Sequence, residues 1–490
     1  MKNCFLLFLF FILAGTGFSC LHTDQLSHTN PLDPDNPDNT NSNPDNNAPV
    51  IGSFTATPST LDKHQTATLE VTAQDIDQDN LTYTYNITSG KGKLGGSSGN
   101  IESFTASNTG GTVDIEVTVN DTKGGSDSAT VTVTVNPSWV RLGSILSEQN
   151  PSALEIAISM QNQVYIAFND PRNLQNVVCV KKLSNAVWVN VGTPVNVDTQ
   201  KLDLELDFNN TPYIVYKDSS RITVRRYTNN SWQLVGAAQS ISIDSPRTTP
   251  DLEFTQNNTP YLAFADYGSN KNIRLMRFNG SEWVQTAPLL PPNGTNDVDV
   301  AELEIDSQNR IFIAFTTNGS VNDGLYIKEW TGSSWLYLSG NTGSYGTKIP
   351  LSDAPVQSAD FIIREETLFA CVRKNDGGNQ QLSALEYDPT MWELRGSEDF
   401  TADAFGKPSL AFDTSGRLHA LFWDNNNNQR PGIMRYNGGM WEYIDYSSFN
   451  NAVNQAGVAD MECAIDQNDI IYILTTDNDE SGRAVVYAYN

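Results

Sequence analysis

The feature that most constrains the fold is a repeat of about fifty residues that runs from residue 150 to the end of the chain. Each unit reads as strand, tight turn, strand, loop, strand, Asn/Gly-containing turn and a last strand with a tryptophan. The equivalent tryptophans are Trp188, Trp232, Trp283, Trp335, Trp392 and Trp441, preceded five places earlier by Leu183, Tyr227, Phe278, Trp330, Tyr387 and Tyr436. Four strands in a repeat of this length are typical of a β-propeller blade.

The last unit of the repeat is incomplete. After residue 461 it offers three strands, and the chain ends at Asn490, before the position where the tryptophan would fall. The missing strand is found upstream in "SWVRLG", residues 138–143, where Trp139 has no three strands of its own before it. An open blade edge invites unwanted pairing. We therefore expect residues 138–143 to complete the last blade of a seven-bladed propeller spanning 138–490.

Residues 49–137 predict a separate all-β domain. Apolar and polar residues alternate along several short strands separated by turn residues, a pattern typical of a β-sandwich. The stretches "AQDIDQDNLTYTY" and "VNDTKGGSDSATVTVTV" resemble the PKD and cadherin-like, Ig-like modules of bacterial surface proteins. The resemblance implies a spacer or adhesion unit.

Four acidic residues of this domain are candidates for a Ca²⁺ site: Asp75, Asp77, Asp79 and Asp121. Carboxylate oxygens at alternating positions suit this cation. The alternative is an Asx-rich turn in which each carboxylate accepts hydrogen bonds from its own backbone. We expect no other cofactor.

The first 48 residues predict export. Residues 1–19 have one Lys followed by an apolar run from Phe5 to Ala14, which is long enough for a signal peptide and too short for a membrane span. The stretch "GTGFSC" resembles a bacterial lipoprotein signal, which implies a lipidated Cys20 and, with Leu21 after it, the outer membrane. Simple secretion is the alternative. Residues 20–48, rich in Asp, Asn and Pro, read as an extended acidic tether.

The net charge of the chain restricts the classes of partner that it can bind. With 30 basic and 57 acidic residues, the formal net charge of −27 disfavours nucleic acid and anionic lipid head groups. Neutral glycans, cations and basic proteins remain compatible with it. The basic residues of the third strands, Lys182, Arg226, Arg277 and Arg435, are expected to form salt bridges or to be solvated.

The long connections of the propeller predict a binding face. The links 286–300, 341–357 and 445–460 should gather at one end of the ring, where loops carry function. Residues at the exit of each second strand would circle the same end: Asp170, Asp218, Asp266, Thr317, Lys374, Asp424 and Asp477, with Tyr345 and Tyr446 nearby. They could bind sugar hydroxyls or a cation, or an Asp could only bond the turn that it opens.

The motifs favour binding over catalysis. The sequence has no Ser/His/Asp set, metal-ligand cluster or phosphate loop, and its "PYxAF…YNGxxW" units resemble a broad group of bacterial extracellular propellers. We expect a non-catalytic surface lipoprotein that binds a glycan or a protein partner. The alternative is a glycan-active hydrolase or lyase, because two carboxylates suffice for glycoside cleavage. Its candidates are Asp218, Asp266 or Asp424 with Glu302.

Overall fold

The computed structural model of the chain describes residues 46–107, 109–172, 175–218, 221–237, 241–242, 249–266, 272–290, 297–318, 324–338, 356–376, 378–388, 391–445 and 461–489. The chain divides into two compact units: the first ends at Val133, and the second comprises the residues from Thr134 onward together with the short segment Ser107–Gly111. All of the regular structure in the described ranges is β-strand, apart from two single 3₁₀ turns. No helix in these ranges is long and apolar enough to cross a membrane.

The first unit is the predicted sandwich of two four-stranded sheets, with the strand orders β1–β3–β6–β5 and β2–β8–β7–β4. Alternate residues of each sheet point inward, so that Leu69 and Val71 of one sheet and Val117 and Val133 of the other are fully buried. The strands are β1 (Val50–Thr57), β2 (Thr60–Leu61), β3 (Thr66–Gln74), β4 (Thr82–Ser89), β5 (Gly92–Leu94), β6 (Ile101–Ala106), β7 (Gly111–Asn120) and β8 (Ser126–Val135).

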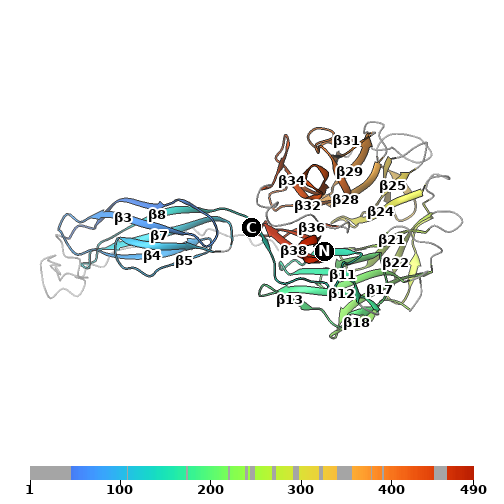
Figure 1. Cartoon of the computed structure of the whole chain (residues 1–490), viewed down its shortest axis with the longest axis horizontal. Helices are drawn as coiled ribbons and strands as arrows, with labels where there is room; N and C mark the ends of the chain where they lie inside the picture. The colour runs from blue at the N-terminus through green and yellow to red at the C-terminus, as the bar shows by residue number, and fades with distance from the viewer. Residues whose placement is uncertain are drawn as a thin grey trace, which may run out of the picture. The chain divides into compact units, whose positions relative to one another are not determined.

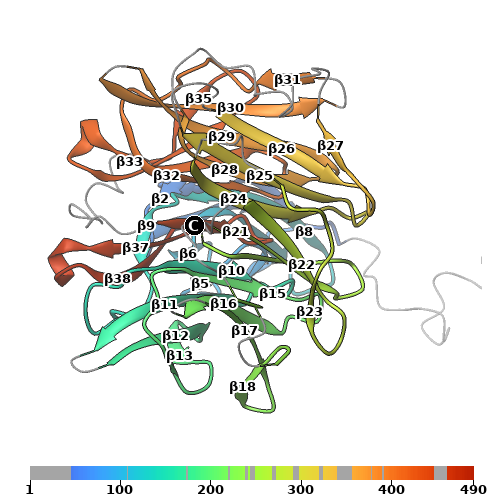
Figure 2. The same ribbon diagram turned by 90° about the vertical axis from the view of Figure 1, so that its right-hand side faces the viewer.

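The second unit contains seven antiparallel sheets, each built on a path of four strands. The first strand of each sheet contacts the first strands of the two neighbouring sheets, and β36 of the last sheet contacts β10 of the first. The sheets therefore form a closed ring, with the first strands innermost. Figure 2 shows β10, β15 and β24 in the middle of the unit and β13, β18 and β31 at its periphery.

Blades 1 to 4 take their strands in chain order. Their bounds are β10 (Leu154–Ile158), β11 (Val164–Arg172), β12 (Gln175–Ser184), β13 (Val187–Asn190) and the short β14 (Val195–Asn196) for blade 1; β15 (Leu202–Leu206), β16 (Pro212–Asp218), β17 (Arg221–Thr228), β18 (Ser231–Leu234) and the short β19 (Ile241–Ser242) for blade 2; β20 (Asp251–Phe254), β21 (Pro260–Asp266), β22 (Asn272–Phe278) and β23 (Trp283–Gln285) for blade 3; and β24 (Asp297–Ile305), β25 (Ile311–Asn318), β26 (Gly324–Trp330) and β27 (Trp335–Tyr337) for blade 4.

Blades 5 and 6 do the same, whereas blade 7 takes its outer strand from the other end of the propeller sequence. Their bounds are β28 (Val356–Arg364), β29 (Thr367–Asp376), β30 (Asn379–Asp388) and β31 (Met391–Leu394) for blade 5; β32 (Ala404–Phe412), β33 (Leu418–Asp424), η1 (Asn425–Asn427), β34 (Arg430–Tyr436) and β35 (Trp441–Tyr443) for blade 6; and β36 (Glu462–Ile465), β37 (Ile471–Asp477), η2 (Asn478–Glu480), β38 (Arg483–Tyr489) and β9 (Trp139–Arg141) for blade 7.

The predicted closure of the ring is confirmed. Strand β9 pairs antiparallel with β38, with Trp139 opposite Tyr489, and Figure 1 shows β38 beside the strands of blade 1. The ring centroids of Trp139 and Tyr489 are 5.1 Å apart. The same pair recurs inside single blades, for example 5.3 Å between Tyr227 and Trp232. The borrowed strand thus reproduces the contact that the repeat makes elsewhere.

The tryptophans also join neighbouring blades. The indole N–H of Trp232 donates to the carbonyl of Val191 at 3.0 Å, and that of Trp283 donates to Val235 at 2.8 Å. The residue after each accepting carbonyl is a glycine with positive φ, Gly192 and Gly236, whose missing side chain lets the indole approach. The spacing of tryptophan in the sequence therefore follows from the need to join one blade to the next.

Candidate functional site

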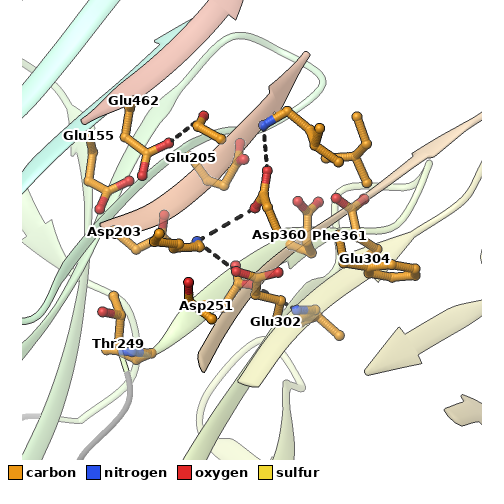
Figure 3. A pocket seen from close by; sticks show the side chains of 18 of the residues that line it. Glu155, Asp203, Glu205, Thr249, Asp251, Glu302, Glu304, Asp360, Phe361 and Glu462 are labelled. Atoms are coloured by element: carbon orange, nitrogen blue, oxygen red, sulfur yellow. Dashed lines mark hydrogen bonds and ion pairs between the residues drawn. The ribbon is translucent and has the colours of Figure 1, made fainter. Parts of the chain in front are cut away.

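A cavity of about 430 Å³ lies among the first strands at the centre of the propeller. Its wall includes Lys201 and Thr249, which precede first strands, and Gln357, the second residue of first strand β28, so the cavity reaches the end of the ring where the blade-to-blade links enter. Figure 3 shows the labelled acidic side chains converging on this space. Nine carboxylates line it: Glu155, Asp203, Glu205, Asp251, Glu253, Glu302, Glu304, Asp360 and Glu462.

Strand periodicity explains why the acids gather there. Successive side chains of a strand point to opposite faces, so residues two apart share a face. In the segments "LDLEL" of β15 and "DLEF" of β20, Leu202, Leu204 and Leu252 are buried between blades while the acids that alternate with them face the centre. In an open sheet, acids at alternate positions usually face solvent. Here the ring of blades closes, so these acids line the central cavity instead.

The carboxylates nearest the link end also join the blades. A side-chain oxygen on one first strand accepts the backbone N–H of the next first strand at four junctions. These bonds run from Leu252 N to Asp203 Oδ2 (2.9 Å), from Leu303 N to Asp251 Oδ2 (2.6 Å), from Leu410 N to Asp360 Oδ2 (2.6 Å) and from Cys463 N to Ser409 Oγ (3.1 Å). This layer of acids therefore has a structural role.

The second layer, two residues further along each strand, is divided into two halves. Glu205, Glu253 and Glu304 occupy it on three consecutive blades, and all three line the cavity. Ile362 takes the equivalent position on blade 5 and also lines the cavity. On blades 6, 7 and 1, the equivalent second-layer position of the first strand is an alanine. One half of this layer is therefore acidic, and the other half is apolar.

Crowding changes the ionisation of these acids. Burial, reinforced by neighbouring carboxylates, raises the pKa of Glu205 and of Asp251 to about 8. Burial raises the pKa of Glu302 to about 8 as well, although Lys407 opposes the shift. Burial and like charges hold the pKa values of Glu253 and Glu304 well above their usual range. Near neutral pH several of these groups therefore carry a proton and can donate as well as accept hydrogen bonds.

Lys407 supplies a countercharge at the link end of the cavity. Its Nζ lies 2.6 Å from Glu302 Oε1 and 3.6 Å from Asp360 Oδ1. These two carboxylates, together with that of Glu462, raise the pKa of the ammonium well above its usual range, in spite of its burial. The three second-layer glutamates face the cavity without such an ion pair among the described residues.

The predicted rim residues lie where expected along the chain, at the ends of second strands, but four of the five aspartates are buried against their own blades. Asp424 accepts from Asn426 N at 3.0 Å and from the Tyr443 phenol at 2.9 Å. Asp477 makes the same pair of contacts, with Asp479 N and Tyr487.

Asp170 and Asp266 have arginine partners, and Lys374 is buried against two acids. Asp170 pairs with Arg172 at 3.1 Å, and Asp266 pairs with Arg274 at 2.8 Å. Lys374 is 2.7 Å from Asp399 and also contacts Glu398. These three residues are held by ion pairs, whereas Asp424 and Asp477 make the turn bond that the sequence offered as the alternative.

Other predicted site residues remain open. Asp218 is exposed at the end of β16, and Thr317 lies within β25. Cys20, Tyr345 and Tyr446 fall outside the described residues, as do the signal peptide and nearly all of the tether. A role for these residues in binding or lipidation remains a prediction.

The candidate calcium ligands serve mainly as backbone acceptors. Asp121 accepts the backbone N–H groups of Lys123, Gly124 and Gly125, and Asp75 accepts that of Asp77 at 2.8 Å. Within the described ranges, no group of three or more His, Cys, Asp or Glu residues is arranged to hold a metal ion. Asp75 and Asp121 thus make the turn contacts of the alternative reading, and a Ca²⁺ site at these four aspartates remains a prediction.

The comparisons identify the first unit. Residues 46–134 match the family model described as a bacterial Ig domain. This unit is Ig-like. The match covers the sandwich and stops before β9, the strand that closes the propeller. No curated protein matches the chain.

Solved structures resemble the chain at low identity. An α-L-arabinofuranosidase from Fusarium graminearum is 12% identical with a TM-score of 0.41, over 72% of this chain and 97% of that one. The polysaccharide lyase Uly1 is 11% identical with a TM-score of 0.46, over 70% and 90%. An auxiliary nutrient binding protein from Bacteroides ovatus is 12% identical with a TM-score of 0.42, over 91% and 98%. None of these likenesses assigns a function.

Proposed function

We propose that this chain is a non-catalytic binding protein of the bacterial cell envelope, and that the central cavity of its propeller binds a glycan. The observation that carries the proposal is the divided second layer of the cavity. Glu205, Glu253 and Glu304 line one half, and Ile362 lines the other. A sugar has the same two-sided character, with hydroxyl groups at its edge and C–H groups on its faces.

The protonation state of these acids suits hydrogen bonding to sugar hydroxyl groups. A carboxyl group that holds a proton donates one hydrogen bond and accepts others, as a hydroxyl partner requires. The pKa near 8 of Glu205 places such a mixed population at neutral pH. The volume of about 430 Å³ also lies within the usual range for small-molecule sites.

The electrostatics favour binding over glycoside cleavage. An acid and base pair needs two carboxyl groups whose surroundings push their pKa values apart. Here burial raises the pKa values of Glu205, Asp251 and Glu302 alike to about 8. None of these three groups is singled out as the one that stays ionised.

The proposed location follows from the leader sequence. A lipid on Cys20 would attach the chain to the outer membrane, and residues 20–48 would hold the folded units away from its surface. The Ig-like unit would then add a spacer between the tether and the propeller.

A glycan array, read with the mature protein at pH 7, tests the function. We expect retained, uncleaved glycan, and a loss of at least tenfold in affinity for Glu253→Ala and Glu304→Ala, each of which removes a carboxyl that lines the cavity. The control is Glu393→Ala, on the exposed face of outer strand β31. Released sugar would instead indicate an enzyme, and silence on every glycan would favour a protein partner; either result would contradict the proposal.

A further inference from the structure

A second cavity, of about 400 Å³, lies between blades 2 and 3 at the end of the propeller that carries the tight turns. It is formed by residues at the start of second strands, the end of third strands and the turns beside them, and it contains no carboxylate. The residues that give it chemical character are Arg226, Arg277, Tyr213, Phe278, Asn258 and Asn279. We call it the arginine pocket.

The two arginines hold equivalent positions in neighbouring blades. Arg226 lies opposite Tyr213 in the β16–β17 pairing, and Arg277 lies opposite Tyr261 in the β21–β22 pairing. Both arginines are exposed. The Arg226 guanidinium hydrogen-bonds the Tyr213 phenol, whereas the guanidinium of Arg277 makes no ion pair or hydrogen bond within the described part of the chain.

The absence of a carboxylate partner is informative in a chain with 57 acidic residues and 30 basic ones. Asp207 acts electrostatically on the Tyr213 phenol, but its Oδ1 already accepts the backbone N–H groups of Asn209 and Thr211. The pocket is therefore locally positive in a strongly negative protein, which is the electrostatic character of an anion site.

The remaining polar groups of the pocket are also donors. The side-chain oxygen of Asn258 accepts the N–H of Phe208 at 2.7 Å, and that of Asn279 accepts the N–H of Ser281 at 3.0 Å. Since both side-chain oxygens are engaged by backbone N–H groups, the amides present their NH₂ groups as donors to a ligand. Guanidinium and amide donors together favour a ligand rich in acceptor oxygens.

The pocket also offers an aromatic wall. Phe278 is half-buried, and its ring packs against Trp283 with the centroids 5.6 Å apart, so its orientation is fixed. The volume of the pocket leaves room for more than an inorganic anion beside the guanidinium groups. A ligand that fits should therefore join an anionic group to a ring with an apolar face.

We propose that the arginine pocket binds an acidic saccharide, with a carboxylate or sulfate group between Arg226 and Arg277 and a sugar ring against Phe278. The planar guanidinium is suited to bind such groups through two parallel hydrogen bonds. The pocket is separate from the central cavity, and it requires neither the proposed function nor the lipid anchor.

Titration calorimetry of the mature protein tests the pocket with a tetragalacturonate, a sulfated galactan tetrasaccharide, maltotetraose and sodium sulfate. We expect at least one of the two acidic saccharides to bind and maltotetraose to fail. Raising NaCl from 50 to 300 mM should weaken binding several-fold, since charge supplies part of the affinity.

Arg277→Ala is the decisive variant, because the Arg277 guanidinium has no ion-pair or hydrogen-bond partner among the described residues. It should lower the affinity at least tenfold, with an unchanged midpoint of thermal unfolding. The matched control is Arg435→Ala, at the equivalent position of blade 6, which should stay within twofold of the unmodified protein.

Glu304→Ala in the central cavity should leave the affinity of the arginine pocket unchanged, so failure of one site is distinguishable from failure of the other. The proposal is overturned if neither acidic saccharide binds, if Arg277→Ala binds as well as the unmodified protein, or if sulfate competes as well as the saccharides.

Discussion

Glu205, Glu253 and Glu304 occupy one position of the repeat on three consecutive blades, and no other blade carries an acid there. A purely structural role would be expected to recur around the ring, as the role of the turn aspartates does on blades 2, 4, 6 and 7. Asp207 and Asp306, for example, each accept two backbone N–H groups of the turn that they begin. The three glutamates break the repeat instead, and such a departure is more easily explained by a ligand.

The raised pKa values make stability depend on pH. A carboxyl whose folded pKa exceeds its unfolded pKa binds more protons in the folded state, so the stability that it contributes falls as pH rises between the two values. For Glu205 that interval runs from the ordinary value of 4.5 to about 8. We expect the free energy of unfolding of the propeller to fall from pH 5 to pH 8, measured by urea unfolding at constant salt.

Glu205→Gln removes one of these titrations while keeping the shape of the side chain. It should flatten the pH profile and raise the stability at pH 8 by on the order of 1–3 kcal/mol. The control Glu393→Gln, on outer strand β31, should leave the profile unchanged. A stability that stays level or rises from pH 5 to pH 8 would show that the acids of the cavity are ionised in the folded protein.

At the scale of elements, β9 contributes more than its three residues suggest. Trp139 is 5% exposed and packs in a cluster with Ile471, Ile473 and Tyr487 of blade 7. Without this strand, β38 would present an unpaired edge, and the ring would open at one blade.

Trp139→Ala tests this contribution. Loss of a buried tryptophan in a packed cluster costs about 3–5 kcal/mol, and we expect a decrease of that size in urea unfolding. The comparison variant is Trp392→Ala, in blade 5, which is also 5% exposed. Only the Trp139 variant should in addition form oligomers through the freed edge of β38. A loss below about 1 kcal/mol would mean that β9 does not close the ring.

Periodicity predicted the elements well, because tryptophan spacing and turn residues are local signals. The closing strand could be placed from Trp139 alone, since its sequence lacks the three strands that should precede it. The cavity could not be predicted in this way. The acids of "LDLEL" read as the solvent face of an ordinary strand, and only ring closure turns that face inward. Partners such as Tyr443 for Asp424 come from a distant strand of the same blade, where sequence offers no sign of them.

Arg226 and Arg277 illustrate a second limit of the sequence. Basic residues on third strands were expected to be salt-bridged or solvated. Each of these two arginines is exposed, so this expectation describes each of them individually. Their shared pocket exists only because blades 2 and 3 pack side by side. The signal available in the sequence was the equal position of two arginines in neighbouring repeats.

At the scale of the whole propeller, the two cavities differ in position and in charge. The central cavity reaches the end with the long links and is lined by nine carboxylates and two lysines, whereas the arginine pocket lies at the end with the tight turns and contains no carboxylate. A saccharide that carries both hydroxyl-rich and acidic units could use both sites. We propose that the central cavity is the principal binding site.

A crystal structure of the mature protein with the glycan selected on the array would locate the bound sugar. We expect a sugar ring in the central cavity, with hydroxyl groups within hydrogen-bond distance of at least two of Glu205, Glu253 and Glu304 and a C–H face toward Ile362. Glycan bound only at the outer loops or in the arginine pocket, with the central cavity free of it, would show that the central cavity is not the principal binding site.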